Sequence, residues 1–206
     1  PCGYLTPEGE VITEAEVREL TGKDEEAISR ASSTGKALMT VLNRGVVRIG
    51  DRKADEALLD QLLSGDRDAL LLAILKVTFG KEVKSPAFCT KCDEIKEAQV
   101  DLDTDVKIKV MTDPINERVF TVEGRNQEIT VQLPNGKAQK ELINNSEKTV
   151  AELNSILLEH TVIKIGDMPV VSKTQVQNLG IVDRKKIIDE LNARVAGPQL
   201  ADLTVT

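Results

Sequence analysis

Two of the three cysteines in this 206-residue chain, Cys89 and Cys92, form a Cys-x-x-Cys motif. Thiolates at this spacing, on a tight turn between strands, both reach one Zn²⁺ ion because the turn points both sulfur atoms inward. A structural zinc ion normally takes four ligands. The other candidate ligands, Cys2 and His160, each stand alone and far away in the sequence. We therefore predict that Cys89 and Cys92 form half of a structural zinc site, with a metal-free turn as the alternative.

A redox pair is a third interpretation of the same two cysteines. A reactive thiol needs a lowered pKa, which a helix N-terminus or a nearby positive charge provides. Here Asp93 and Glu94 directly follow Cys92, and their negative charges disfavour a thiolate. Electrostatics thus favours a structural turn over a thiol oxidoreductase.

The other motifs in the sequence do not indicate catalysis. His160 is the only histidine, and its position near the end of an expected helix is typical of a structural cap. Thr34-Gly35-Lys36 lacks both the earlier glycine and the following Ser or Thr of a phosphate-binding loop. The sequence also has no G-x-S-x-G nucleophile elbow and no H-E-x-x-H motif. We expect a protein that is not an enzyme and whose only cofactor would be a structural zinc ion.

Composition and charge argue against two classes of partner. The formal net charge is -7, the wrong sign for holding a phosphate backbone, and the basic residues do not cluster. No stretch approaches the roughly 20 apolar residues that span a bilayer. We expect no binding to nucleic acid or to membranes. Three cysteines do not make a disulfide framework, which is typical of a protein made in a reducing compartment.

Residues 1–80 are expected to form an N-terminal arm, a strand and a group of helices. The segment from Val11 to Leu20 alternates apolar and polar residues well enough for a half-buried strand, although a helix is possible. Thr21 and Asp24 resemble a capping arrangement at a helix start. Further helices are expected at about 35–43, 54–63 and 66–79, with a short strand at 46–50. The helix at 66–79 is apolar on nearly every side, which predicts a central helix buried by its neighbours.

Residues 81–136 are expected to form a small β-rich, zinc-ribbon-like insertion. Strands predicted at 82–88 and 97–102 lie on either side of the cysteines. Apolar and polar residues alternate strictly on both sides of Gly124-Arg125-Asn126, which predicts a β-hairpin. Pro134-Asn135-Gly136 predicts another turn. The strands of this hairpin are expected at 118–123 and 128–133.

Residues 137–206 are expected to form a C-terminal helical part that packs on the N-terminal part. Thr149 and Glu152 form a capping box for one helix, and Asp183 caps the last helix, which Gly197-Pro198 stops. A final strand is expected at 203–206. The whole chain is thus predicted to have an α+β fold with a mainly helical body.

Two short passages share a strand-and-turn pattern. They are R-G-V-V-R-I-G-D, ending at Asp51, and T-V-I-K-I-G-D, ending at Asp167, and each follows an expected helix. This similarity indicates either a distant duplication or a ribbon in which the two passages pair.

Four longer phrases carry a resemblance to a known family. They are E-V-R-E-L-T-G-K-D-E-E-A-I, L-N-R-G-V-V-R-I-G-D, G-D-R-D-A-L-L-L-A-I-L-K-V-T-F-G and T-V-A-E-L-N-S-I-L-L-E-H. In this order they resemble the baseplate hub assembly proteins of contractile-tailed bacteriophages of the T-even type. The resemblance covers most of the chain, and it consists of apolar patterns around short phrases.

The resemblance implies a non-enzymatic tail or baseplate protein that binds other tail proteins in a hetero-oligomeric assembly. It would be found in the virion or in the host cytoplasm during assembly. Relatives carry the Cys-x-x-Cys at Cys89 and Cys92, and many carry a second pair just beyond a strand like the one expected at 203–206. The chain stops where that second pair would begin, so we expect either a lost C-terminus or half a ribbon without zinc. A zinc-ribbon adaptor in the host cytoplasm, with possible nucleic-acid binding, is the alternative.

Overall fold

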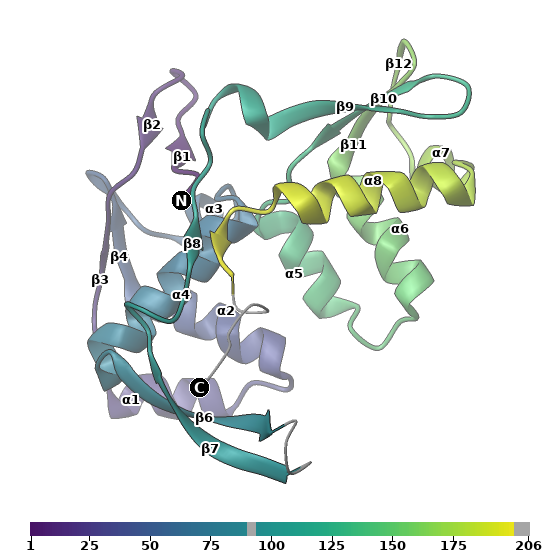
Figure 1. The fold of residues 1–206 in the computed structure, drawn as a ribbon. Helices are drawn as coiled ribbons and strands as arrows, with labels where there is room; N and C mark the ends of the chain where they lie inside the picture. The colour runs from purple at the N-terminus through teal and green to yellow at the C-terminus, as the bar shows by residue number, and fades with distance from the viewer. Residues whose placement is uncertain (90–93, 200–206) are drawn as a thin grey trace.

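The computed structural model describes residues 1–89 and 94–199 and has an α+β fold (Figure 1). Its larger part consists of two units with the same order of elements. The N-terminal unit comprises β3 (Ala15–Val17), α1 (Gly22–Ser29), α2 (Thr34–Gly45), β4 (Val46–Ile49), β5 (Arg52–Lys53), α3 (Glu56–Leu59) and α4 (Ser64–Phe79). The C-terminal unit comprises β10 (Glu128–Gln132), α5 (Gly136–Asn144), α6 (Val150–Thr161), β11 (Val162–Ile165), β12 (Met168–Pro169), α7 (Lys173–Gln177) and α8 (Ile181–Arg194).

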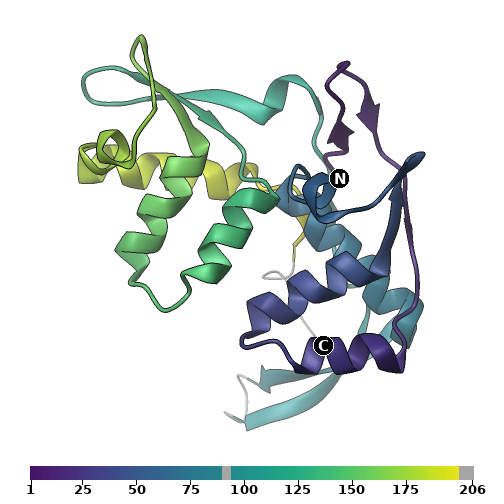
Figure 2. The same cartoon turned by 180° about the vertical axis from the view of Figure 1, so that it is seen from behind.

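The remaining elements precede, join and follow the two units. A short N-terminal hairpin pairs β1 (Tyr4–Leu5) with β2 (Val11–Ile12). Between the units lie β6 (Glu82–Cys89), β7 (Glu94–Asp101), β8 (Ile108–Lys109), a 3-10 turn (Asn116–Arg118) and β9 (Val119–Glu123). After the C-terminal unit, β13 (Gly197–Pro198) pairs with β8. Figure 2 shows the helix pair α1 and α2 in one half of the molecule and the pair α5 and α6 in the other.

Each unit has its own hydrophobic core. In the N-terminal unit, Leu42, Ile49, Leu59 and Ile74 are buried together between the helices and the sheet. The buried residues of the C-terminal core include Val122, Ile129, Val131, Leu158, Ile187 and Leu191. Because aromatic side chains are scarce, aliphatic residues make up nearly all of both cores.

The strand pairing is the same in the two units, and the register shifts at the same position in both. Residues 15–17 of β3 pair antiparallel with β4, and the register shifts between Glu16 and Val17. Residues 129–131 of β10 pair with β11 in the same way, and the register shifts between Thr130 and Val131. The turn after β4 and the turn after β11 each use a glycine with positive φ, 55° at Gly50 and 57° at Gly166. The two matching passages therefore occupy equivalent places in two units and do not pair with each other, which favours duplication over a paired ribbon.

An arginine also repeats near the start of the last helix of each unit, buried at Arg67 and partly buried at Arg184. Arg67 on α4 donates to the carbonyl oxygen of Leu59 at 2.7 Å. Arg184 on α8 donates to the carbonyl oxygen of Val176 at 3.0 Å. In both units this bond ties the last helix to the short helix that precedes it.

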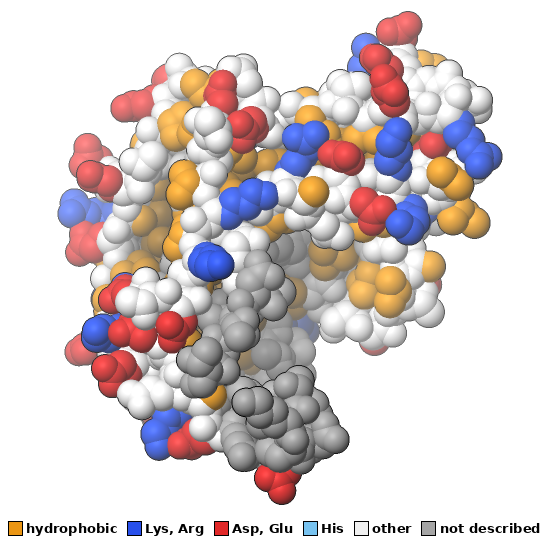
Figure 3. All heavy atoms as spheres, in the orientation of Figure 1, with side chains coloured by type: hydrophobic (Ala, Val, Ile, Leu, Met, Phe, Trp, Pro, Cys, Tyr) orange, Lys and Arg blue, Asp and Glu red, His pale blue; other side chains and the backbone are white. Residues whose placement is uncertain are grey.

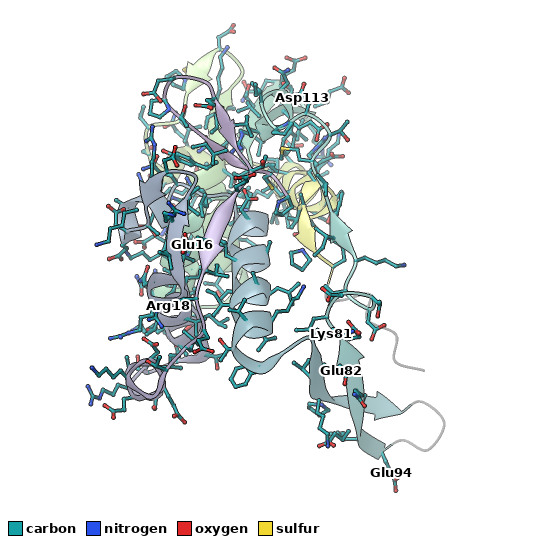
Figure 4. All side chains as sticks on the ribbon, turned by 90° about the vertical axis from the view of Figure 1, so that its left-hand side faces the viewer. Glu16, Arg18, Lys81, Glu82, Glu94 and Asp113 are labelled. Atoms are coloured by element: carbon teal, nitrogen blue, oxygen red, sulfur yellow. The ribbon has the colours of Figure 1, made fainter. Side chains whose placement is uncertain are left out.

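The predicted strands around the cysteines form a long antiparallel hairpin, β6 and β7, paired from Glu82 with Asp101 to Cys89 with Glu94. Figure 4 shows Lys81 at its base and Glu94 at its far end, away from the helices. At the base of the hairpin, Val100 of β7 forms a third, small core with Leu102 and Val106, which follow it.

The predicted β-hairpin at 118–133 is confirmed, but its strands belong to the sheet of the C-terminal unit. The order in that sheet is β12-β11-β10-β9. Residues 81–136 therefore do not share a single sheet. The zinc-ribbon-like character of this segment stays a prediction.

Two sequence predictions at element ends were wrong for one shared reason. The helix expected at 54–63 is only Glu56–Leu59, and the turn expected at Pro134-Asn135-Gly136 is the start of α5. Leu63 and Asn135 form an isolated β-bridge, so the backbone at Leu63 is extended and a new helix begins at Ser64. The Asn135 side chain accepts from the amides of Lys137 and Ala138 and caps α5.

Two further expectations hold in part. The strand expected over residues 11–20 divides into β2 and β3. The helix expected at 66–79 is central, but its burial is one-sided. Leu70 and Ile74 are buried, whereas Leu71, Leu72 and Leu75 are half-buried.

Candidate interaction surface

The structure places the two predicted metal ligands at the far end of the β6–β7 hairpin. Cys89 is the last residue of β6 and pairs in register with Glu94. Cys92 lies outside the described residues, as does the strand expected at 203–206. Within residues 1–89 and 94–199, no group of three or more His, Cys, Asp or Glu side chains is arranged to hold a metal ion. The zinc half-site at Cys89 and Cys92 therefore stays a prediction.

Cys2, another candidate ligand in the sequence, is part of the interior. Its side chain is 2% exposed, and burial together with the nearby Asp66 carboxylate raises the pKa of the thiol to about 12. A thiol with so high a pKa is neither a nucleophile nor a ready metal ligand at neutral pH.

His160 lies in the last turn of α6, where a positive charge is favourable. Its backbone carbonyl accepts from Nε2 of Gln132 at 2.9 Å, which ties the end of α6 to β10. This position agrees with the structural role expected for His160.

The Asp66 carboxylate connects the N-terminal segment to the start of α4. It accepts from the amides of Cys2 at 2.8 Å and Gly3 at 3.1 Å. Arg118, just before β9, donates to the Gly3 carbonyl at 2.5 Å. These charged groups therefore hold three segments together, which is a structural arrangement.

An apolar cavity of about 520 Å³ lies beside the half-buried side of α4. Asp68 is the one charged residue among its described lining residues, and burial raises the pKa of that carboxyl group. Such a lining is better suited to holding an apolar side chain than to catalysing a reaction. The apolar residues lining it are Leu20, Leu38, Val41, Leu71, Leu72, Ile74, Leu75, Phe79, Val83, Val100, Leu102, Val106 and Pro198.

A second apolar feature lies on the outside of the C-terminal unit. Figure 3 shows hydrophobic side chains gathered at the end of the molecule formed by α7 and the start of α8. Ile181 is 85% exposed and Val171 is 84% exposed, and Val182 is also exposed. We call Ile181 and Val182, which are neighbours at the start of α8, the α8 patch. Exposed apolar side chains of this size are typical of protein contact sites when they lie together.

Neither apolar surface is evident from the amino-acid sequence. The prediction that Asp183 caps the last helix was wrong, because α8 begins at Ile181 after Gly180 and Asp183 lies within its first turn. The sequence pattern therefore did not reveal that Ile181 and Val182 lie exposed at the start of this helix. The cavity lies between α2, α4 and the β6–β7 region, so the residues that line it come from segments far apart in the chain. In the part of the chain that the structure describes, no helix is both long and apolar enough to cross a bilayer.

Comparison with known protein families gives a match over most of the chain. A family model described as T4 bacteriophage base plate protein matches residues 6–194. This range takes in both units and the β6–β7 hairpin between them. No curated protein and no solved structure matches the chain significantly.

Proposed function

We propose that this chain, which belongs to the family of T4 bacteriophage base plate proteins, is a non-enzymatic structural or assembly protein of a contractile-tail baseplate. It acts by binding other tail proteins, as the baseplate hub assembly proteins that its sequence resembles are expected to do. The observation that carries the proposal is the family match over residues 6–194. The protein would work in the host cytoplasm during assembly, in the virion tail, or in both.

The described surface supports binding as the mode of action. The α8 patch exposes apolar side chains that a partner would bury, and burial of apolar surface is the main favourable term in most protein association. The cavity beside α4 gives a second apolar surface, and Asp68 is the one carboxylate among its described lining residues. The net charge of -7 is unfavourable for a nucleic-acid partner, so we propose proteins as the partners.

The β6–β7 hairpin adds a projecting arm to this proposal. We assign to its tip a structural turn in which Cys89 and Cys92 hold half of a zinc site. Thiolates bind Zn²⁺ at neutral pH, and a zinc ion would stiffen the turn against a docking partner. Intact mass and metal analysis of the natural protein tests this assignment. Bound zinc that is lost in Cys92→Ser supports it, and a metal-free wild-type protein contradicts it.

The experiment that tests the binding function is proximity cross-linking in infected cells. A tagged copy of the chain is expressed during infection, cross-linked and recovered, and the attached peptides are identified by mass spectrometry. The proposal predicts cross-links to baseplate proteins that increase as tails assemble. Cross-links confined to host proteins or to nucleic acid would contradict it.

A further inference from the structure

The strand β3 lies at the edge of its sheet, which has the order β3-β4-β5. The Glu14 carbonyl and the Arg18 amide each form a 2.8 Å hydrogen bond to residues that flank β4. Because backbone groups alternate in direction along a strand, those of Ala15 and Val17 point away from β4. Ala15 is exposed, and within the described residues no strand pairs with this outer edge. Figure 4 shows Glu16 and Arg18 on this strand, at the face that the view presents.

The equivalent edge of the C-terminal unit is covered by a strand of the same chain. β9 pairs antiparallel with β10, with Val122 opposite Ile129 and Phe120 opposite Val131. Because the register is the same in both units, Ile129 and Val131 occupy the positions in β10 that Ala15 and Val17 occupy in β3. This type of unit can therefore accept an antiparallel strand along this edge, and the C-terminal unit already does so.

The side chains of β9 also fill space that stays open in the N-terminal unit. Val122 is buried in the C-terminal core, and the Phe120 ring lies 4.4 Å from the guanidinium carbon of Arg194. A cavity of about 220 Å³ lies beside β3, lined by Ala15 and Val17 and, among others, by the small Ala69 and Ala73 of α4. Figure 3 shows apolar side chains in the hollow between β3 and β8.

We propose that the outer edge of β3 and this adjoining cavity bind an extended segment of a neighbouring baseplate protein as an added antiparallel strand. This inference rests on the proposed function for the identity of the partner. Main-chain hydrogen bonds to Ala15 and Val17 would provide affinity, and the cavity would select apolar side chains at alternate positions of the segment. An unpaired edge of this kind readily accepts a strand from another chain.

Charge along the edge indicates the kind of segment. Glu14 and Glu16 are exposed there, and Glu16 already pairs with Arg48 at 2.7 Å, so it is Glu14 that favours Lys or Arg opposite it in the bound segment. A second copy of this chain is a poorer occupant. Antiparallel pairing through Ala15 would set Glu14 of one copy opposite Glu16 of the other, and directly opposed like charges are destabilising.

The first arm of the test uses a peptide and needs no other baseplate protein. The probe is a peptide with the sequence of residues 117–124, the strand that covers the equivalent edge, carrying Glu123→Lys (E-R-V-F-T-V-K-G), because Glu123 would otherwise lie opposite Glu14. We expect saturable shifts in the NMR signals of the Ala15 and Val17 amides, and slower hydrogen exchange at both. A scrambled peptide should leave both amides unchanged. Binding elsewhere, or the same effect from both peptides, would overturn the inference.

Matched proline variants separate the edge from general effects on the fold. Ala15→Pro removes an outward-pointing amide, and edge strands tolerate proline at such positions. Lys53→Pro is the control on the opposite edge of the same sheet, because the Ala54 amide donates to the Val47 carbonyl and Lys53 therefore points outward. We expect Ala15→Pro to weaken peptide binding by about tenfold, the factor for loss of one or two hydrogen bonds, and Lys53→Pro to leave it unchanged. Should Ala15→Pro not fold, the exchange rates in the wild-type protein decide the question.

The second arm distinguishes failure of this inference from failure of the proposed function. Both variants are introduced into the phage gene, and assembled baseplates are counted by electron microscopy. Fewer baseplates with Ala15→Pro than with Lys53→Pro support the inference.

If the chain is required for assembly and Ala15→Pro assembles as well as wild type, the inference fails and the function stands. If the peptide binds β3 and phage lacking the chain still assemble tails, the function fails together with the baseplate partner, and only a strand-binding edge remains. Dimers of the free protein that Ala15→Pro abolishes would show that a second copy is the occupant, against the proposal.

Discussion

At the residue scale, the strongest electrostatic feature is the buried carboxylate of Asp24. It is 1% exposed, yet it accepts two hydrogen bonds from Arg18, at 2.8 Å and 2.9 Å, and one from Arg44 at 3.2 Å. It also accepts from the Thr21 amide at the start of α1. These donors, Arg18 first, hold the pKa of Asp24 well below its ordinary value. The sequence predicted the contact with Thr21 from their spacing, whereas the two arginines come into contact through the fold.

Asp24→Asn tests this cluster through the pH dependence of stability. Because the pKa of Asp24 is lower in the folded than in the unfolded protein, its contribution is present above the ordinary aspartate pKa and is lost as pH falls. We expect the variant to be less stable than wild type near about pH 7, with the difference shrinking toward about pH 2. Chemical denaturation across this range measures it. Glu26→Gln is the control, because Glu26 forms only an exposed ion pair with Arg30, and a constant difference at all pH values would contradict the account.

Cys2 gives a second prediction at this scale. With a buried thiol whose pKa is raised to about 12, Cys2 should resist N-ethylmaleimide in the native protein near neutral pH and react after denaturation. Peptide mapping by mass spectrometry reads the modification at Cys2 itself. Rapid labelling of Cys2 in the native state would show that the N-terminal segment does not stay packed against Asp66.

At the element scale, local signals in the sequence were sufficient where an element depends on its own residues. The capping boxes at Thr21 and Thr149 begin α1 and α6, and strict alternation identified β9 and β10. The ends near Leu63 and Asn135 could not be predicted, because these residues meet across a long separation in the chain. A proline-asparagine-glycine run is typical of a turn, and only the tertiary contact makes it the start of a helix.

The repeated arginine gives a prediction that compares equivalent elements. Arg67 is 1% exposed and also donates to Oε1 of Gln139 at 2.7 Å, whereas Arg184 is only partly buried. Arg67→Ala should lower the free energy of unfolding by roughly 3–5 kcal/mol, because it leaves buried polar groups without a partner. Arg184→Ala should lower the free energy of unfolding by about 1–2 kcal/mol, because water can reach the polar groups that lose Arg184 as their partner. Urea denaturation measures both, and equal losses would contradict the burial argument.

At the scale of the whole molecule, one architecture occurs twice with different surroundings. The two short passages that contain Gly50 and Gly166 indicated a duplication, but the shared register depends on how the strands pair in the fold. The start of α4 is covered, because Gly65 lies against Ala196 and Gly197. The start of α8 is exposed at Ile181. The two units therefore present different surfaces to partners, which composition alone does not reveal.

The α8 patch gives the prediction at this scale. Ile181→Asp places a charge on an exposed apolar position, so the fold should be retained and the melting temperature should change little. If the patch contacts a tail protein, burial of that charge should reduce baseplate assembly strongly. Asn192→Asp is the matched control, because it adds the same charge at an exposed position on the same helix. Equal assembly by both variants would show that the patch is not a contact surface.

The most direct test of the central claim is removal of the gene from the phage, followed by electron microscopy of the infected-cell lysate. If the chain is a structural or assembly protein of the baseplate, the lysate should lack complete baseplates and contractile tails, and expression of the chain from a plasmid should restore them. Normal, infectious particles without the chain would contradict the claim.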